Sequence, residues 1–129
     1  MEQNIIKNVA AAAYELWKKN GGATVMIEEG DNRRYVIGGV GDTKVIPIAQ
    51  FAASDIEEFL RVELPCVPAI VFGVAFLVGC GVWTRGDTVV LDLVDRRETL
   101  KEAQFAATKY EQEAFYDSVE GRVINVRLD

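Results

Sequence analysis

The amino-acid sequence predicts a single α+β domain over residues 1–129. We expect a mostly antiparallel sheet of about five to seven strands, together with about three helices. Two patterns carry this prediction. Apolar residues recur at helical spacing in several segments, and short β-rich runs alternate with turn residues in between. The chain length suits one hydrophobic core.

The first half of the chain begins with a helix and continues with strands. Residues 4–19 form an amphipathic pattern, which predicts the first helix. Residues 23–28 and 33–38 are β-rich and predict a hairpin, and a third short strand is expected at residues 44–48. Pro47 has no amide hydrogen, so it places this third strand at a sheet edge or ends it early.

A second helix is expected next, followed by an uncharged segment. Ser54 and Glu57 have the spacing of a capping box, and Pro65 and Pro68 end the helix behind it. The run from 67 to 83 carries no charge and predicts one or two buried strands in the centre of the sheet. The alternative is a single membrane-spanning helix, for which the run is barely long enough.

The C-terminal half predicts hairpin, helix, strand and strand. Residues 82–94 contain two β-rich runs around a glycine-containing turn. Asp95, with Glu98 three residues later, predicts an N-cap and a capping box that start the third helix. Two short strands are expected at residues 113–117 and 122–128.

The charge of the chain limits its partners. The formal net charge is −6, and the sequence pI is about 4.7. Binding to a nucleic-acid backbone or to an anionic membrane requires clustered Lys and Arg, so we expect neither. An acidic protein suits a protein partner with a basic face, including an enzyme that itself binds nucleic acid.

The composition excludes several kinds of active site. The sequence contains no histidine, and its two cysteines are Cys66 and Cys80. Imidazole-based catalysis and the usual zinc sites are therefore excluded within one chain. We expect no cofactor and no metal site, reduced buried thiols, and, because no signal-peptide pattern begins the sequence, a cytoplasmic location.

Two short motifs suggest functions but are better explained as turns. The glycine-rich stretch 38–42 resembles a phosphate-binding loop, yet a strand-like run follows it where such a loop needs a helix. Arg85, Gly86 and Asp87 spell the tripeptide of integrin ligands at the tip of the expected hairpin, where a glycine is needed for the turn itself.

Asp92 is the most informative carboxylate, because it lies in the middle of an apolar strand. By alternation it faces away from its neighbours Leu91 and Leu93. A carboxylate in such a place needs a partner, and the sequence offers Arg96, Arg97 or Arg122 for an ion pair. The alternative is a catalytic acid or a metal ligand that acts together with other carboxylates.

Aromatic side chains cluster in the same half of the chain. They are Trp83, Tyr110, Phe115 and Tyr116. Most aromatic residues at such spacings belong to the core, and the alternative is an exposed platform for stacking or for partner binding.

The order of these C-terminal motifs is similar to that of a group of small domains. A Gly-Trp strand at 81–83, a Leu-Asp strand at 91–94, an acidic-capped helix from 95, and a Gln-x-Ala-Phe-Tyr-Asp strand at 112–117 follow one another. This succession resembles uncharacterised accessory domains of phages, plasmids and other mobile elements, over roughly residues 79–126. The resemblance implies an α+β fold and a mobile-element setting, with no established activity.

Composition and resemblance together predict a non-enzymatic binding protein. We expect a phage or mobile-element factor that binds and inhibits a host nucleic-acid-binding defence enzyme. The alternatives are a small carboxylate- or metal-dependent enzyme that acts on a nucleotide or phosphoester, and a homo-oligomer formed through residues 67–83. The candidate partner-binding residues are Trp83, Arg85, Asp92, Glu98, Asp117 and Glu120.

Overall fold

The computed structural model describes residues 3–67 and 78–126. In chain order the elements are α1 (Gln3–Asn20), β1 (Gly22–Met26), β2 (Tyr35–Pro47), η1 (Ile48–Gln50), α2 (Ala53–Glu63), η2 (Leu64–Cys66), β3 (Val78–Arg85), β4 (Thr88–Arg97), α4 (Leu100–Lys109), β5 (Ala114–Asp117) and β6 (Arg122–Asn125). Within the described residues, three α-helices accompany one six-stranded sheet, which confirms the predicted α+β class.

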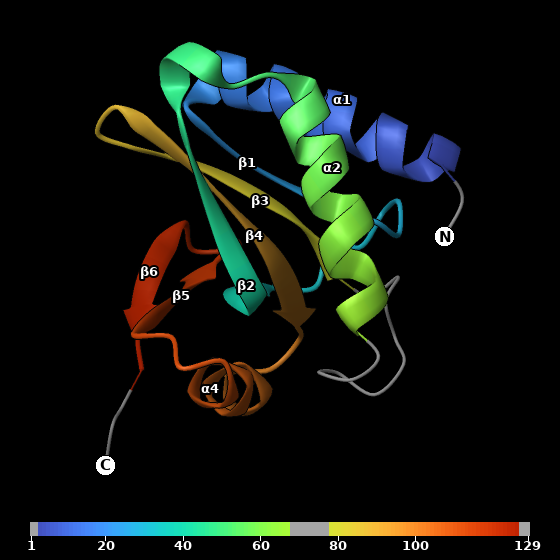
Figure 1. Ribbon diagram of the computed structural model, residues 1–129. Coiled ribbons are helices and arrows are strands. Elements are labelled where there is room, and N and C mark those ends of the chain that lie inside the picture. Colours follow the sequence, from blue (N-terminus) through green and yellow to red (C-terminus); the bar gives the residue numbers. More distant parts are fainter. Residues whose placement is uncertain (1–2, 68–77, 127–129) are drawn as a thin grey trace.

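All neighbouring strands of the sheet are antiparallel, in the order β1-β3-β4-β2-β5-β6 (Figure 1). The predicted β3–β4 hairpin is present, and Gly86 in its turn has a φ of 60°. The predicted C-terminal strands are β5 and β6, which also pair as a hairpin.

The structure corrects two predictions for the first half of the sheet. Segments 33–38 and 44–48 belong to one long strand, β2, so the glycine-rich stretch between them is not a turn. The expected hairpin of 23–28 with 33–38 is also wrong, because β1 pairs with β3 and β2 pairs with β4. Pro47 is the last residue of β2, which agrees with the prediction that it ends the strand.

The predicted starts of the second and third helices are misplaced. The carboxylate of Asp55 accepts a hydrogen bond from the amide of Ala52 at 2.8 Å, so α2 begins with Ala52 as its N-cap and Ser54 lies inside the helix. Asp95 belongs to β4, and α4 is capped by Thr99, whose hydroxyl oxygen accepts from the Glu102 amide at 3.2 Å. The Thr99–Glu102 pair has the spacing of a capping box.

The uncharged run 67–83 contributes β3, which lies between β1 and β4 inside the sheet. Within β3, Val78 and Val82 are buried, as predicted for a central strand, whereas Trp83 is 41% exposed. Val67 is also buried, but it follows η2 and belongs to no strand. The rest of the run, 68–77, lies outside the described residues. The predicted stop at Pro68 falls in that segment as well.

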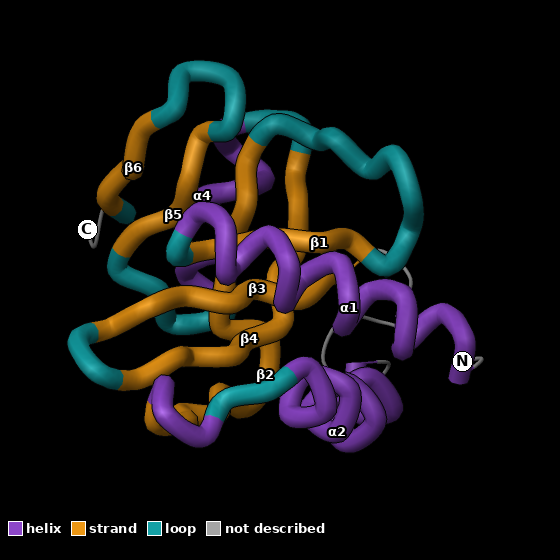
Figure 2. Tube along the Cα trace, turned by 90° about the horizontal axis from the view of Figure 1, so that it is seen from above, coloured by secondary structure: helices purple, strands orange, loops and turns teal. Residues whose placement is uncertain are grey.

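The helices and the sheet enclose one hydrophobic core. Ile6 of α1, Ile56 of α2 and Ala106 of α4 belong to the same buried cluster as Val89 and Leu91 of β4. Helices α1 and α2 lie side by side, whereas α4 packs beside β2, β4 and β5 (Figure 2). Alternate residues of the strands therefore point into this core, and the remaining ones point to the opposite side of the sheet.

We call that opposite side the open face. Its side chains include Val45 of β2, Trp83 of β3, Asp92 of β4 and Tyr116 of β5. Trp83 and Tyr116 are 41% and 42% exposed, and Val45 is 57% exposed. The open face thus presents large apolar side chains that the core does not use.

Candidate functional site

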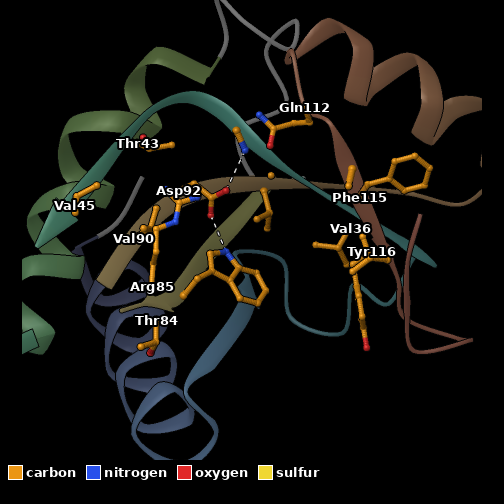
Figure 3. Close-up of a pocket in the computed structure, with 16 residues that line it drawn as sticks. Val36, Thr43, Val45, Thr84, Arg85, Val90, Asp92, Gln112, Phe115 and Tyr116 are labelled. Atoms are coloured by element: carbon orange, nitrogen blue, oxygen red, sulfur yellow. Dashed lines mark hydrogen bonds between the residues drawn. The ribbon is translucent and has the colours of Figure 1, made fainter. Parts of the chain in front are cut away.

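A pocket of about 510 Å³ lies on the open face, and Asp92 is among its lining residues (Figure 3). Its position follows from the register of β2 against β4. Val40 pairs with Leu93 and Lys44 pairs with Leu91, so residues 41–43 of β2 stand opposite the single residue Asp92. This bulge separates the two strands and leaves the space beside the carboxylate.

Asp92 is held by two neutral hydrogen-bond donors. One carboxylate oxygen accepts from the amide of Gly39 at 3.0 Å, and the other accepts from the indole N–H of Trp83 at 3.3 Å (Figure 3). The expected ion pair with an arginine is therefore wrong for Arg96 and Arg97. Arg97 pairs with Asp95, and the Arg96 guanidinium donates to the carbonyl of Arg33 and to Ser118.

Glycines surround the Asp92 carboxylate because nothing larger fits there. Gly81 lies directly opposite Asp92 on β3. A Cβ atom built on Gly81 would lie 2.2 Å from one carboxylate oxygen, and a Cβ on Gly38 would lie 2.4 Å from the other. Both distances are far shorter than a van der Waals contact. The glycine-rich stretch thus lets the backbone of β2 approach the carboxylate closely.

Burial raises the pKa of Asp92 above its ordinary value, whereas the hydrogen bonds from Gly39 and Trp83 act in the opposite direction. The residue is 8% exposed and lies at the floor of the pocket. A carboxyl group in this environment takes up a proton more readily than an exposed one does.

Two other predicted site residues, Trp83 and Arg85, also line the pocket. They alternate on β3 and therefore share the open face with each other. Gln112 and Tyr116 line it as well, and the Gln112 side-chain amide donates to the carbonyl of Tyr110 at 3.0 Å. Gln112 begins the Gln-x-Ala-Phe-Tyr-Asp motif but is not among the predicted site residues, because a polar residue between a helix and a strand carries no specific signal of a site.

The aromatic residues of this half divide between the two sides of the sheet. Tyr110 and Phe115 are 8% and 4% exposed and belong to the core. Trp83 and Tyr116 lie on the open face, as alternation along β5 requires for Tyr116 and Phe115. The interpretation as core is therefore correct for Tyr110 and Phe115, whereas Trp83 and Tyr116 are exposed.

Asp117 has a structural role apart from the pocket. Its carboxylate forms a bidentate pair with the Arg34 guanidinium at 2.9 and 2.8 Å and also accepts from the amides of Val119 and Glu120. Arg34 lowers the pKa of Asp117 far below its usual range, against the opposing effect of burial. The carboxylate of Glu120 lies 4.0 Å from Arg34 and is largely exposed.

Glu98 is exposed and lies in the bend between β4 and α4. The predicted set of six is therefore divided. Trp83, Arg85 and Asp92 meet at the pocket, whereas Asp117 and Glu120 lie at the β5–β6 turn.

Comparison with protein-family models, with curated proteins and with solved structures finds no match to this chain. Among the helices of residues 3–67 and 78–126, none is long and apolar enough to cross a membrane. Within the same residues, no group of three or more Cys, Asp or Glu side chains is placed to hold a metal ion.

The chemistry of the pocket follows from these neighbours. It offers an aromatic surface, one cationic side chain and one buried carboxyl group that is already bonded to two donors. Such a surface suits recognition by stacking and apolar contact, oriented by a few polar groups.

Proposed function

We propose that this chain is a cytoplasmic, non-enzymatic binding protein whose open face contacts a protein partner with a basic surface. Following the resemblance to mobile-element domains, the proposed partner is a host nucleic-acid-binding defence enzyme. The chain would inhibit that enzyme by occupying its cationic nucleic-acid site.

One observation carries the proposal: the open face presents large apolar side chains next to a pocket. Trp83, Tyr116 and Val45 come from three different strands and are all more than a third exposed. Aromatic side chains at the centre of a surface patch are the residues that contribute most to protein–protein affinity.

The net charge of −6 supports the choice of a basic partner. Long-range attraction between an acidic protein and a cationic groove speeds their encounter and weakens as salt screens it. The exposed carboxylates Glu98 and Glu120 are available to contribute to this attraction.

The test is affinity capture of the tagged chain from bacterial lysate at low and at moderate salt, with mass spectrometry of the captured proteins. We expect a stoichiometric, salt-sensitive partner that Val45→Ser with Tyr116→Ser no longer captures. Val62→Ser on α2 is the matched control, because Val62 is 59% exposed and belongs to a helix. Capture that is equal for all variants would contradict the proposal.

A second variant separates the electrostatic attraction from the apolar contact of the open face. Glu98→Gln with Glu120→Gln removes two exposed charges without altering the open face. If the encounter is electrostatic, this variant weakens capture at low salt. Unchanged capture would refute the electrostatic part and leave the apolar contact intact.

Asp92 favours one other candidate function, a small enzyme that acts on a nucleotide or phosphoester. Its raised pKa and its place in the pocket suit a general acid or base. If Asp92 has this role, a mononucleotide added with or without Mg²⁺ raises the melting temperature of the wild type more than that of Asp92→Asn. No difference between the two proteins would exclude Asp92 from such a role.

A further inference from the structure

A second concave surface lies between the outer side of α4 and the edge strand β6, and we call it the α4–β6 groove. Its volume is about 950 Å³. The lining residues are Leu100, Lys101, Gln104, Phe105 and Thr108 of α4, and all four residues of β6. It does not include the Asp92 pocket, although Val123 borders both.

The wall formed by β6 is the edge of the strand. Successive side chains of a strand point to opposite faces, so four consecutive residues line one groove only if the edge itself borders it. Strand β6 is last in the order of the sheet, which leaves one of its edges without a partner among the described strands.

The ladder indicates which amides of β6 point outward. The Val126 amide donates inward, to the carbonyl of Glu113, at 2.9 Å. Backbone donors alternate in direction along an antiparallel strand. The amides of Val123 and Asn125 therefore point away from β5, toward the groove.

The groove also exposes large apolar side chains. Phe105 is 69% exposed, Leu100 is 48% exposed and Val123 is 65% exposed. Phe105 lies on the side of α4 that faces away from the buried residues Ala103 and Ala107, whereas Leu100 is in the first turn of the helix, at the border of the buried side. A contiguous set of exposed apolar residues of this kind marks an interaction surface.

The charge of the groove is opposite to that of the whole chain. Its ionisable lining residues are Lys101 and Arg122, with no carboxylate among them, whereas the chain carries a net charge of −6. An acidic segment therefore complements the groove, and a basic one does not.

We propose that the α4–β6 groove binds an extended acidic segment of a protein partner, which adds to the sheet as a strand next to β6. Backbone groups of β6 pair with the segment, apolar side chains of the segment contact Phe105 and Leu100, and its carboxylates contact Lys101 and Arg122. This site shares only Val123 with the Asp92 pocket, and it stands whether or not the open face binds a basic partner.

A second copy of this chain fits the groove less well. Symmetric pairing of β6 with β6 brings together two grooves whose ionisable lining residues, Lys101 and Arg122, are all cationic. Neither groove lining then offers the other a carboxylate, and the approach of like charges is unfavourable.

The test is selection of binders to the intact chain from a displayed library of random decapeptides, followed by calorimetry with the enriched peptides. We expect the enriched peptides to alternate apolar residues with Asp or Glu. Asn125→Pro removes an outward amide while keeping the β5–β6 bonds, and Phe105→Ser removes the apolar contact. Each substitution should raise the Kd of such a peptide by about tenfold or more.

Matched controls use the same chemistry elsewhere on the surface. Val119→Ser alters a residue that is 67% exposed in the β5–β6 turn, and it should leave the Kd unchanged. Lys101→Glu with Arg122→Glu should abolish binding, whereas Lys7→Glu on α1 should not. Thermal melting of every variant establishes that it is folded, and the charge-reversed pair serves as the decisive variant if Asn125→Pro does not fold.

The proposal is overturned if the selection enriches no peptide, if it enriches basic peptides, or if the groove variants bind the enriched peptides as well as wild type does while all controls fold. A dimer in light scattering that Asn125→Pro dissociates would show that a second copy, rather than an acidic segment, occupies the edge of β6.

Discussion

The indole N–H of Trp83 donates to a carboxylate oxygen of Asp92 across the β3–β4 pair, over a distance of 3.3 Å. The two residues are diagonal neighbours on the open face, because Gly81 is the residue directly opposite Asp92. The bulge of β2 supplies the second donor, the amide of Gly39. One carboxylate thus joins three strands at the floor of the pocket.

The close approach of Gly38 to Asp92 predicts a specific coupling. Gly38→Ala places a methyl group against a carboxylate oxygen, and we expect it to destabilise the fold by about 1–3 kcal/mol. In an Asp92→Ala background the added methyl group meets no carboxylate, so Gly38→Ala should lower the free energy of unfolding by clearly less. A double-mutant cycle by urea unfolding measures this coupling, and additive costs would contradict the contact.

Asp92 should make stability depend on pH. Burial raises the pKa of the folded carboxyl above its value in the unfolded chain, which is about 3.9. The folded chain then binds the proton more tightly, so this residue's contribution to stability falls as pH rises from about 4 through the folded pKa. The free energy of unfolding of Asp92→Asn should improve relative to wild type over that range.

Urea unfolding of both proteins between about pH 4 and pH 8 measures the difference. The expected size is about 1.4 kcal/mol for each pH unit that separates the folded and unfolded pKa values. If the difference in free energy of unfolding between the two proteins stays constant with pH, folding does not raise the pKa of Asp92.

The Arg34–Asp117 pair predicts the opposite dependence. The pKa of Asp117 is lowered on folding, so its stabilisation is complete above about pH 4 and is lost as pH falls through the folded pKa. Asp117→Asn should lower the urea midpoint at neutral pH, with a difference from wild type that narrows in acid. Glu120→Gln, which changes an exposed neighbour of the same arginine, should leave the midpoint unchanged.

The caps of the helices offer a test of local structure. Thr99→Ala removes the hydroxyl that accepts from the Glu102 amide, and we expect a loss of about 0.5–2 kcal/mol. Ser54→Ala changes a residue inside α2 and should stay within about 0.5 kcal/mol of wild type. Equal effects in thermal unfolding would contradict the observed helix starts.

The sequence was sufficient for the elements that have strong local periodicity. The helix at 4–19, the hairpin around Gly86 and the last two strands follow from side-chain spacing and turn residues. The same local rules misplaced Asp95. Its pattern matches an N-cap, yet in the folded chain its carboxylate accepts from the Tyr110 hydroxyl at 2.9 Å and pairs with Arg97. These are tertiary contacts that local patterns do not contain.

Only part of the candidate site could be predicted, because its other contacts are also tertiary. Alternation correctly separated Asp92 from Leu91 and Leu93, and so indicated an unusual carboxylate. Its donors could not be predicted, because they depend on strand order. Pairing β2 with β4 brings Gly39 to Asp92, and the expected hairpin of 23–28 with 33–38 does not contain this pairing.

Site-specific photo-cross-linking tests the proposed open-face interaction most directly. A photoreactive phenylalanine analogue replaces Val45 on the open face or Val62 on α2, and each tagged protein is irradiated in bacterial lysate at low salt. The account predicts one stoichiometric cross-linked protein with a basic surface from position 45, and none from position 62. The same product from both positions, or from position 62 alone, would contradict the claim that the open face binds the partner.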